Sequence, residues 1–164
     1  MFKDCTSLVN APELPATSFT EAAYKSMFMG CTSLTTAPAL PATELVIQCY
    51  MNMFTGCTSL TQAPALPATT LIAQCYCEMF KDCTSLTTAP ELPAEALVEK
   101  CYSGMFRNCS KLNYVKCMAT SINSYHLDYW LYGVASTGTY VKAANVEWPS
   151  GANGIPEGWT VEEL

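Results

Sequence analysis

One motif, Met-Phe-x-x-Cys-Thr-Ser-Leu, returns at a fixed interval and constrains the fold more than any other feature of the chain. It begins at Met1, Met27, Met53 and Met79, and a looser copy begins at Met105. The interval is 26 residues each time, with no insertion or deletion. Periods of this length are typical of solenoids, in which each unit covers the apolar flank of the next. We therefore expect one solenoid domain.

The first part of each interval predicts a helix. In the third unit, apolar residues stand at i, i+1, i+4, i+5, i+8 and i+9, namely Leu71, Ile72, Cys75, Tyr76, Met79 and Phe80. This spacing places them on one face of an α-helix. Thr69 or Thr70 is a suitable N-cap. Gly56, Asp82 and Asn108, which tolerate left-handed backbone, mark the expected helix ends in successive units.

The residues after Cys-Thr-Ser predict a very short strand in each unit. Leu60–Ala63 is apolar at both ends and polar in the middle, and the following Pro64 lacks the N–H needed to continue a ladder. Parallel strands stack ~4.8 Å apart, whereas helices need ~8–10 Å. The expected fold class is therefore an α/β solenoid that curves, with its strands on the concave face and its helices on the convex face.

The repeat weakens towards the C-terminus, which divides the chain into three expected parts. These are four full repeats and the start of a fifth in residues 1–112, degenerate fifth and sixth repeats in 113–142, and a C-terminal cap in 143–164. Adding 26 to the strand-like segment 112–116 gives 138–142, and Leu131-Tyr132 then falls at the Met-Phe position. Trp148, Trp159 and Val161 are the residues we expect to cover the last repeat.

The motif resembles that of the BspA-like leucine-rich-repeat proteins of anaerobic gut and oral bacteria. The matching residues are Met-Phe-Thr-Gly-Cys-Thr-Ser-Leu at 53–60 and Leu66-Pro67, and the tail segments 132–142 and 154–160 are also similar to the C-terminal ends of such proteins. The resemblance implies a leucine-rich-repeat fold, secretion or display on the cell surface, and in some members adhesion. The Ala-Pro before x-Leu-Pro and the long period depart from the family pattern.

Charge and hydropathy exclude several classes of partner. The net charge is −6 and no basic cluster occurs, so nucleic acid is not expected as a partner. No apolar run reaches the ~18 residues that a membrane span requires. The chain begins at the same repeat position as Met27, so we expect it to be part of a longer protein whose upstream sequence carries a signal peptide. An uncapped first repeat also predicts end-to-end self-association.

Eight of the ten cysteines fall into two repeat columns. Cys5, Cys31, Cys57, Cys83 and Cys109 form the first column, and Cys49, Cys75 and Cys101 form the second. A column repeats one small side chain, whereas a disulfide framework normally joins different positions, so we expect free, buried thiols. The sequence contains no Cys-x-x-Cys pair, and neither a metal nor another cofactor is predicted.

The strand columns supply the candidate ligand-contacting residues: Thr35, Thr36, Thr61, Gln62, Thr87, Thr88, Tyr114 and Tyr140. Neighbouring strand residues point to opposite faces, so only one column is expected to face solvent. Hydrogen bonding along the stack is the alternative role for the threonines. His126, the single histidine, has no convergent catalytic partners in the sequence. The predicted function is a non-catalytic module that binds a surface protein or glycan, with a purely structural spacer as the alternative.

Overall fold

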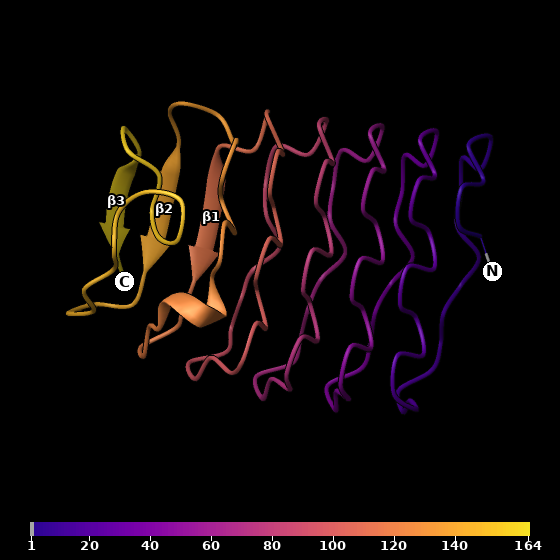
Figure 1. Cartoon of the computed structure of the whole chain (residues 1–164), viewed down its shortest axis with the longest axis horizontal. Helices are drawn as coiled ribbons and strands as arrows, with labels where there is room; N and C mark the ends of the chain where they lie inside the picture. Colours follow the sequence, from indigo (N-terminus) through magenta and orange to yellow (C-terminus); the bar gives the residue numbers. More distant parts are fainter. Residues whose placement is uncertain (1) are drawn as a thin grey trace.

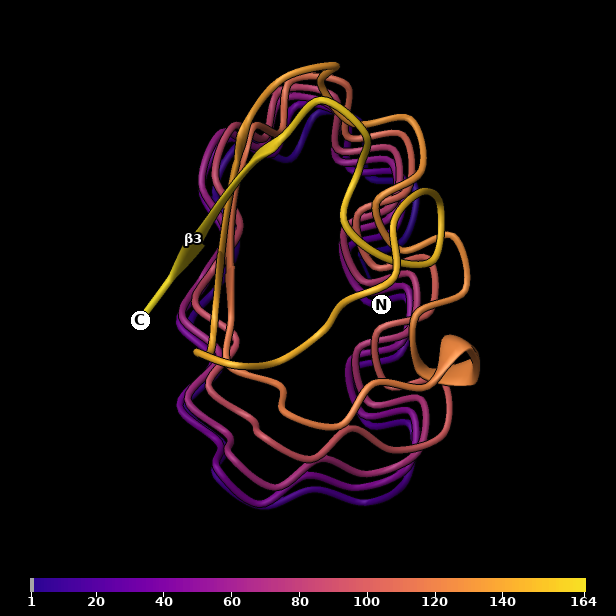
Figure 2. The same ribbon diagram turned by 90° about the vertical axis from the view of Figure 1, so that its left-hand side faces the viewer.

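The computed structural model describes residues 2–164 and consists of coils stacked side by side along one axis. The two termini lie at opposite ends of the stack (Figure 1). Seen along that axis, each coil is an elongated ring with one straight side and one stepped side (Figure 2). We call these the strand side and the turn side. The arrangement is consistent with a solenoid.

Three parallel strands form the regular part of the strand side. They are β1 (Tyr114–Cys117), β2 (Thr139–Lys142) and β3 (Thr160–Glu163), in the order β1-β2-β3. Earlier coils continue the sheet through single parallel bridges, which join Asn10 to Thr36 and Thr36 to Gln62. The prediction of short parallel strands is confirmed near residues 112–116 and 138–142, whereas the segments 34–37, 60–63 and 86–89 contain only single bridges. Two prolines in each proline-rich segment remove ladder donors and limit regular pairing in the first coils.

The predicted helices are wrong. Consecutive turns occupy residues 21–30, 47–56, 73–82 and 99–108, and the only helical element in the described residues is the short 3-10 segment η1 (Ser124–His126). Along each run, every second N–H donates to the carbonyl three residues earlier, as Met51 does to Gln48. The N–H groups between them donate to the next coil, as Tyr50 does to Cys75. An α-helix would instead direct these donors to the fourth preceding carbonyl.

Left-handed backbone at every fourth residue produces the stepped shape of the turn side. In the turn run at residues 47–56 the positive-φ residues are Gln48, Asn52 and Gly56, with φ values of 58°, 57° and 75°. Apolar residues recurring every four positions fit this turn as well as they fit an α-helix, whose period is 3.6. The distinguishing signal is the column of Gly, Asn and Asp at the last of these positions, because these residues tolerate positive φ.

The absence of α-helices in residues 2–164 removes the cause proposed for curvature. Aromatic side chains stack from coil to coil on the turn side. The rings of Phe28, Phe54 and Phe80 are 5.6 Å apart and within 7° of parallel. This spacing is close to the distance between paired strands. The distance between successive coils is therefore similar on the strand side and on the turn side. Tyr50 and Tyr76 form part of a second stack at 5.8 Å.

The core consists of repeat columns, as the motif predicts. Phe54, Cys57 and Leu60 are fully buried, and so are their copies in the next two coils. Nine of the ten cysteines are buried and all ten are free thiols, with Cys5 as the exposed exception. The Cys57 thiol donates to the Phe28 carbonyl at 3.2 Å, a bond repeated by Cys31, Cys83 and Cys109. The column therefore links successive coils without disulfides.

The last coil is one residue out of the expected phase. Tyr114 pairs with Thr139 and Val115 pairs with Tyr140, a shift of 25 residues instead of 26. Phe106 correspondingly donates to Trp130, so Trp130-Leu131 occupies the position expected for Leu131-Tyr132. Because side chains alternate along a strand, this slip moves Tyr140 from the outer to the inner face.

Two of the three expected covering residues pack as predicted. Trp148 stacks on Trp130 at 5.7 Å. Trp159 is 8% exposed and its Nε1 donates to the Ala135 carbonyl at 2.8 Å. Val161 lies opposite Tyr140 where β3 pairs with β2, and it is 44% exposed at the edge of the sheet. All four residues of β3 are exposed because no further strand covers it among the described residues.

Replacing Gly56 tests the left-handed turns. A Cβ there would meet nothing closer than 3.8 Å, so the cost of Gly56→Ala comes from backbone strain alone. We expect a loss of about 1 kcal/mol in the free energy of unfolding, since left-handed backbone disfavours a Cβ. Gly56→Asn is the matched control, because Asn108 adopts φ 62° at the same repeat position. Equal urea midpoints for the Ala and Asn variants would contradict the assignment.

Candidate binding surface

Six of the predicted contact residues form one exposed band on the strand side. We call Thr35, Thr36, Thr61, Gln62, Thr87 and Thr88 the threonine band, and all six are exposed. The expectation that only one of the two columns faces solvent is therefore wrong. Leu34 is buried, the next two residues point outwards, and inward alternation resumes at Pro38, Leu40 and Ala42. A single bridge at Thr36 does not impose the strict alternation of a long strand.

A shallow groove crosses the threonine band between the third and fourth coils. It has a volume of about 320 Å³ and is lined by Thr61, Gln62, Ala63, Thr87, Thr88, Ala89 and Pro90. Hydroxyl and amide groups on its rim can donate and accept hydrogen bonds, while alanine and proline supply its apolar part. No charged side chain lines it. The groove therefore suits a neutral polar ligand with some apolar surface.

The two tyrosines predicted to extend this surface do not lie together. Tyr114 is half-buried at the edge of the band, where it bridges to Thr88. Tyr140 is fully buried, and its ring packs edge-to-face with Trp130 at 6.1 Å and with Trp148 at 5.1 Å. Tyr140 is a core residue of the last coil, and its prediction as a contact residue is wrong because of the register slip.

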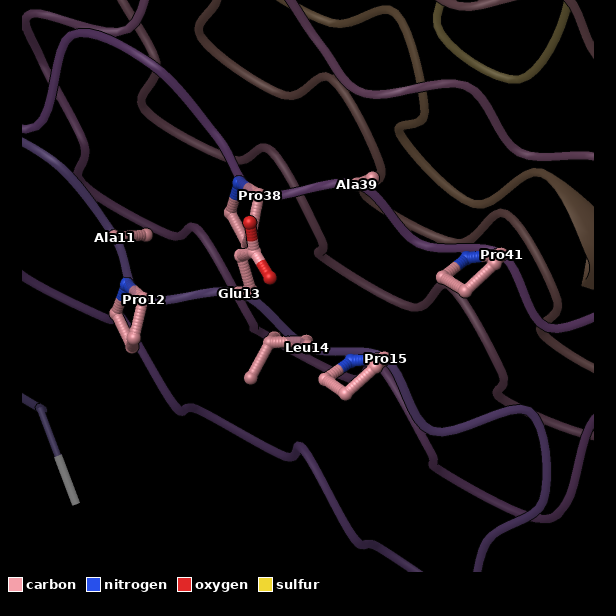
Figure 3. A pocket seen from close by; sticks show the side chains of 8 residues that line it. All are labelled: Ala11, Pro12, Glu13, Leu14, Pro15, Pro38, Ala39 and Pro41. Carbon is pink, nitrogen blue, oxygen red and sulfur yellow. The ribbon is translucent and has the colours of Figure 1, made fainter.

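A second hollowed region, which the sequence analysis did not single out, follows the proline-rich segments. Figure 3 shows one groove of about 230 Å³, between Pro12 and Pro15 of one coil and Pro38 and Pro41 of the next. Similar grooves of about 390 Å³ and 310 Å³ lie between the following coils. The sequence signal for these grooves is the pair of prolines in each of the first four repeats, because residues without an N–H cannot close the gap with ladder bonds.

Exposed aromatic residues gather on the turn side of the last coil. Tyr129 and Tyr132 are 53% and 49% exposed, and their rings are 5.8 Å apart. The Arg107 guanidinium lies 5.6 Å and 6.0 Å from the two ring centroids, which is cation–π geometry. The tyrosine-rich segment 125–132 is the sequence signal for this cluster. The constant period of 26 residues, however, places this segment one residue out of register with the coil before it.

Two side chains with reactive groups, Cys117 and His126, are poorly suited to nucleophilic or acid–base chemistry. Burial raises the pKa of the Cys117 thiol to about 12, so it stays protonated near neutral pH, where a nucleophile needs the thiolate. His126 is half-buried, and desolvation lowers its pKa. Within residues 2–164, no group of three or more His, Cys, Asp or Glu side chains is arranged to hold a metal ion.

The chain matches no protein-family model, and no curated protein or solved structure is significantly similar to it. Across the described part of the chain, no helix has the length and apolar character needed to span a bilayer.

Proposed function

We propose that this chain is a non-catalytic, leucine-rich-repeat-like binding module that contacts a surface protein or glycan through the threonine band. The observation that carries the proposal is the alignment of six exposed, uncharged polar side chains on one side of three successive coils. A rigid core positions them, because Leu34, Leu60 and Leu86 directly before them are fully buried.

The chemistry of the band favours a ligand rich in hydroxyl or amide groups. Threonine hydroxyls and the Gln62 amide both donate and accept hydrogen bonds. The central groove contains no charge, and the whole chain carries a net charge of −6, which disfavours polyanions such as nucleic acid. A neutral glycan or the polar surface of a protein fits these properties.

Lysine substitutions in the groove test this proposal. We expect Thr61→Lys with Thr87→Lys to abolish binding to glycan arrays or captured cell-surface proteins, because long charged side chains would fill the groove. Thr70→Lys is the matched control, since Thr70 is exposed but outside the band. Unchanged unfolding midpoints would show that the variants remain folded. Equal binding by the groove and control variants would contradict the assignment of the site.

A structural spacer is the second candidate function. Thr35, Thr61 and Thr87 are identical from coil to coil, whereas a surface selected for one specific ligand tends to vary along its length. The stacked Phe and Tyr columns give such a spacer a continuous core. No ligand in a broad binding screen, together with full stability of the groove variants, would favour this role.

We further propose that the chain is a BspA-like protein and is secreted or displayed on a cell surface. The motif at residues 53–60 and the tail segment 154–160 support this assignment. Sequencing the complete gene and locating the protein by surface proteolysis of intact cells would test it. Protection of the protein in intact cells would contradict surface display.

A further inference from the structure

The two columns of the threonine band continue onto the coils on either side of it. Val9 and Asn10 occupy the same two repeat positions in the first coil, and Asn113 and Tyr114 occupy them in the fifth. Three of these residues are exposed and Tyr114 is half-buried. None of the ten residues in the two columns carries a charge, although the chain has 14 acidic and 8 basic residues. We call these ten residues the uncharged strip.

The two columns of the uncharged strip repeat differently. The first column is constant in the three central coils, where Thr35, Thr61 and Thr87 are identical. In the second column a threonine alternates with a larger amide or phenol side chain, in the order Asn10, Thr36, Gln62, Thr88 and Tyr114. The first column therefore repeats with every coil and the second with every second coil. A polymer whose units advance by one coil and alternate in orientation matches both columns.

The distance between coils sets the length of one unit of such a polymer. Parallel bridges join neighbouring residues of the second column, as between Asn10 and Thr36 and between Thr36 and Gln62. Paired strands lie ~4.8 Å apart, so two coils span ~9.6 Å. An extended polypeptide repeats its side-chain orientation after ~6.8 Å and does not stay in register with the strip. Successive sugars of a β-1,4-linked chain advance by about one coil and face opposite ways, so this chain does stay in register.

The groove in the threonine band lies at the centre of the strip and has the mixed character that a sugar ring requires. It separates Thr61 and Gln62 of one coil from Thr87 and Thr88 of the next, and it has a volume of about 320 Å³. Hydroxyl and amide groups line it together with alanine and proline, without a charged side chain. A sugar ring carries hydroxyl groups on its edges and C–H groups on its faces. The groove can therefore contact both parts of the ring.

The polar side chains of the strip are available to a ligand. The Thr35 hydroxyl donates to the Val9 carbonyl at 3.4 Å, and the other five side chains of the threonine band make no hydrogen bond to a group of residues 2–164. Hydrogen bonding along the stack therefore accounts for Thr35 alone. At one end of the strip, Tyr114 adds a hydroxyl that can donate and accept and a flat apolar ring.

We propose that the uncharged strip binds a neutral β-1,4-linked polysaccharide that lies along the stack, with one sugar on each coil. The inference rests on the proposed function, because it uses the threonine band, and it adds the class of ligand and its direction. The constant column contacts the chain of rings, which repeats with every sugar. The alternating column contacts substituents that return to the same side on every second sugar. Polymers of glucose and of N-acetylglucosamine share this geometry.

Titration calorimetry of the full chain with oligosaccharides of increasing length tests this arrangement. The probes are β-1,4-linked oligomers of glucose and of N-acetylglucosamine, and maltohexaose, which is α-1,4-linked, is the matched control for the linkage. We expect each added sugar, up to the pentamer, to raise the association constant about three- to tenfold, the gain from about one net hydrogen bond. Binding of either β-linked series in this way supports the proposal, and the tighter series identifies the sugar. Affinity that is independent of length, or equal for maltohexaose and the β-linked hexamers, would overturn it.

Variants at the end and at the centre of the strip separate ligand contact from a structural role. Tyr114→Thr removes one end position, so we expect binding of the pentamer to weaken about threefold or more while binding of the trimer is unchanged. Thr61→Ala with Thr87→Ala removes two central hydroxyls and should weaken pentamer binding about tenfold or more. Thr70→Ala, outside the strip, is the matched control. Equal losses for the trimer and the pentamer in Tyr114→Thr would overturn the assignment of one sugar to each coil.

The same probes distinguish failure of this inference from failure of the proposed function. If the threonine band captures a surface protein or a branched glycan but no β-1,4-linked oligomer, the polysaccharide inference is overturned and the proposed function stands. A proline-rich or other extended peptide that binds the strip more tightly than the β-linked hexamers would also overturn the inference. The absence of binding to every probe and to the glycan array would overturn both.

Discussion

Phe54→Ala is expected to reduce the free energy of unfolding by about 3–5 kcal/mol, the range for truncating a buried aromatic side chain. The Phe54 ring is fully buried, and it stacks between Phe28 and Phe80 at 5.6 Å on each side. Its loss opens a cavity in the middle of the column, where two rigid neighbouring coils limit collapse. Urea denaturation followed by circular dichroism measures the change.

Phe2→Ala is the matched control for this prediction. Phe2 belongs to the same column but is only half-buried and stacks on one side. We expect its replacement to cost less than half as much. Similar losses at both positions would show that the column does not stabilise the stack through two-sided burial.

Raising the pH from 8 to 10 is expected to destabilise the protein by about 5 kcal/mol through four buried thiols alone. Burial raises the pKa of Cys57, Cys109 and Cys117 to about 12 and that of Cys101 to about 11, from an ordinary value of 9.0. Above pH 9 the unfolded chain releases these protons while the folded chain retains them. Stability is therefore complete below pH 9 and falls as the pH rises towards 12.

Urea midpoints at pH 8, 9 and 10 measure this dependence. Cys57→Ala is expected to weaken the loss between pH 8 and 10 by about 1.4 kcal/mol, the contribution of one thiol. Thr70→Ala is the control, because Thr70 is exposed and carries no group that titrates in this range, so its replacement should leave the slope unchanged. A midpoint that stays constant up to pH 10 would contradict the burial of these thiols in the folded state.

The repeat period was sufficient to predict stacked coils, parallel strands and the buried columns. It did not distinguish helix from turn, because apolar pairs spaced by four residues satisfy both. The deciding features were the inter-coil hydrogen bonds of residues such as Tyr50 and the left-handed backbone of Asn52. Neither is visible in the periodicity of apolar residues, although the Gly56, Asp82 and Asn108 column favoured a positive φ.

The candidate surface was predicted in part. The threonine band was identified as two strand columns, but the exposure of both columns depends on an interrupted alternation around Thr35 and Thr36. Tyr140 was misplaced because the last coil is one residue shorter than the repeat. Irregular spacing at the end of an array cannot be recovered by adding a constant period.

The backbone hydrogen bonds between successive turn runs all lead from N–H groups of one coil to carbonyls of the next coil, and this shared direction gives the stack an electric polarity. In each turn run, alternate peptide groups direct their C=O towards the N-terminal end and their N–H towards the C-terminal end. Each peptide carries a dipole of about 3.5 D, so these groups add to a macrodipole whose negative pole lies at the N-terminal end. This is the reverse of an α-helix with respect to chain direction.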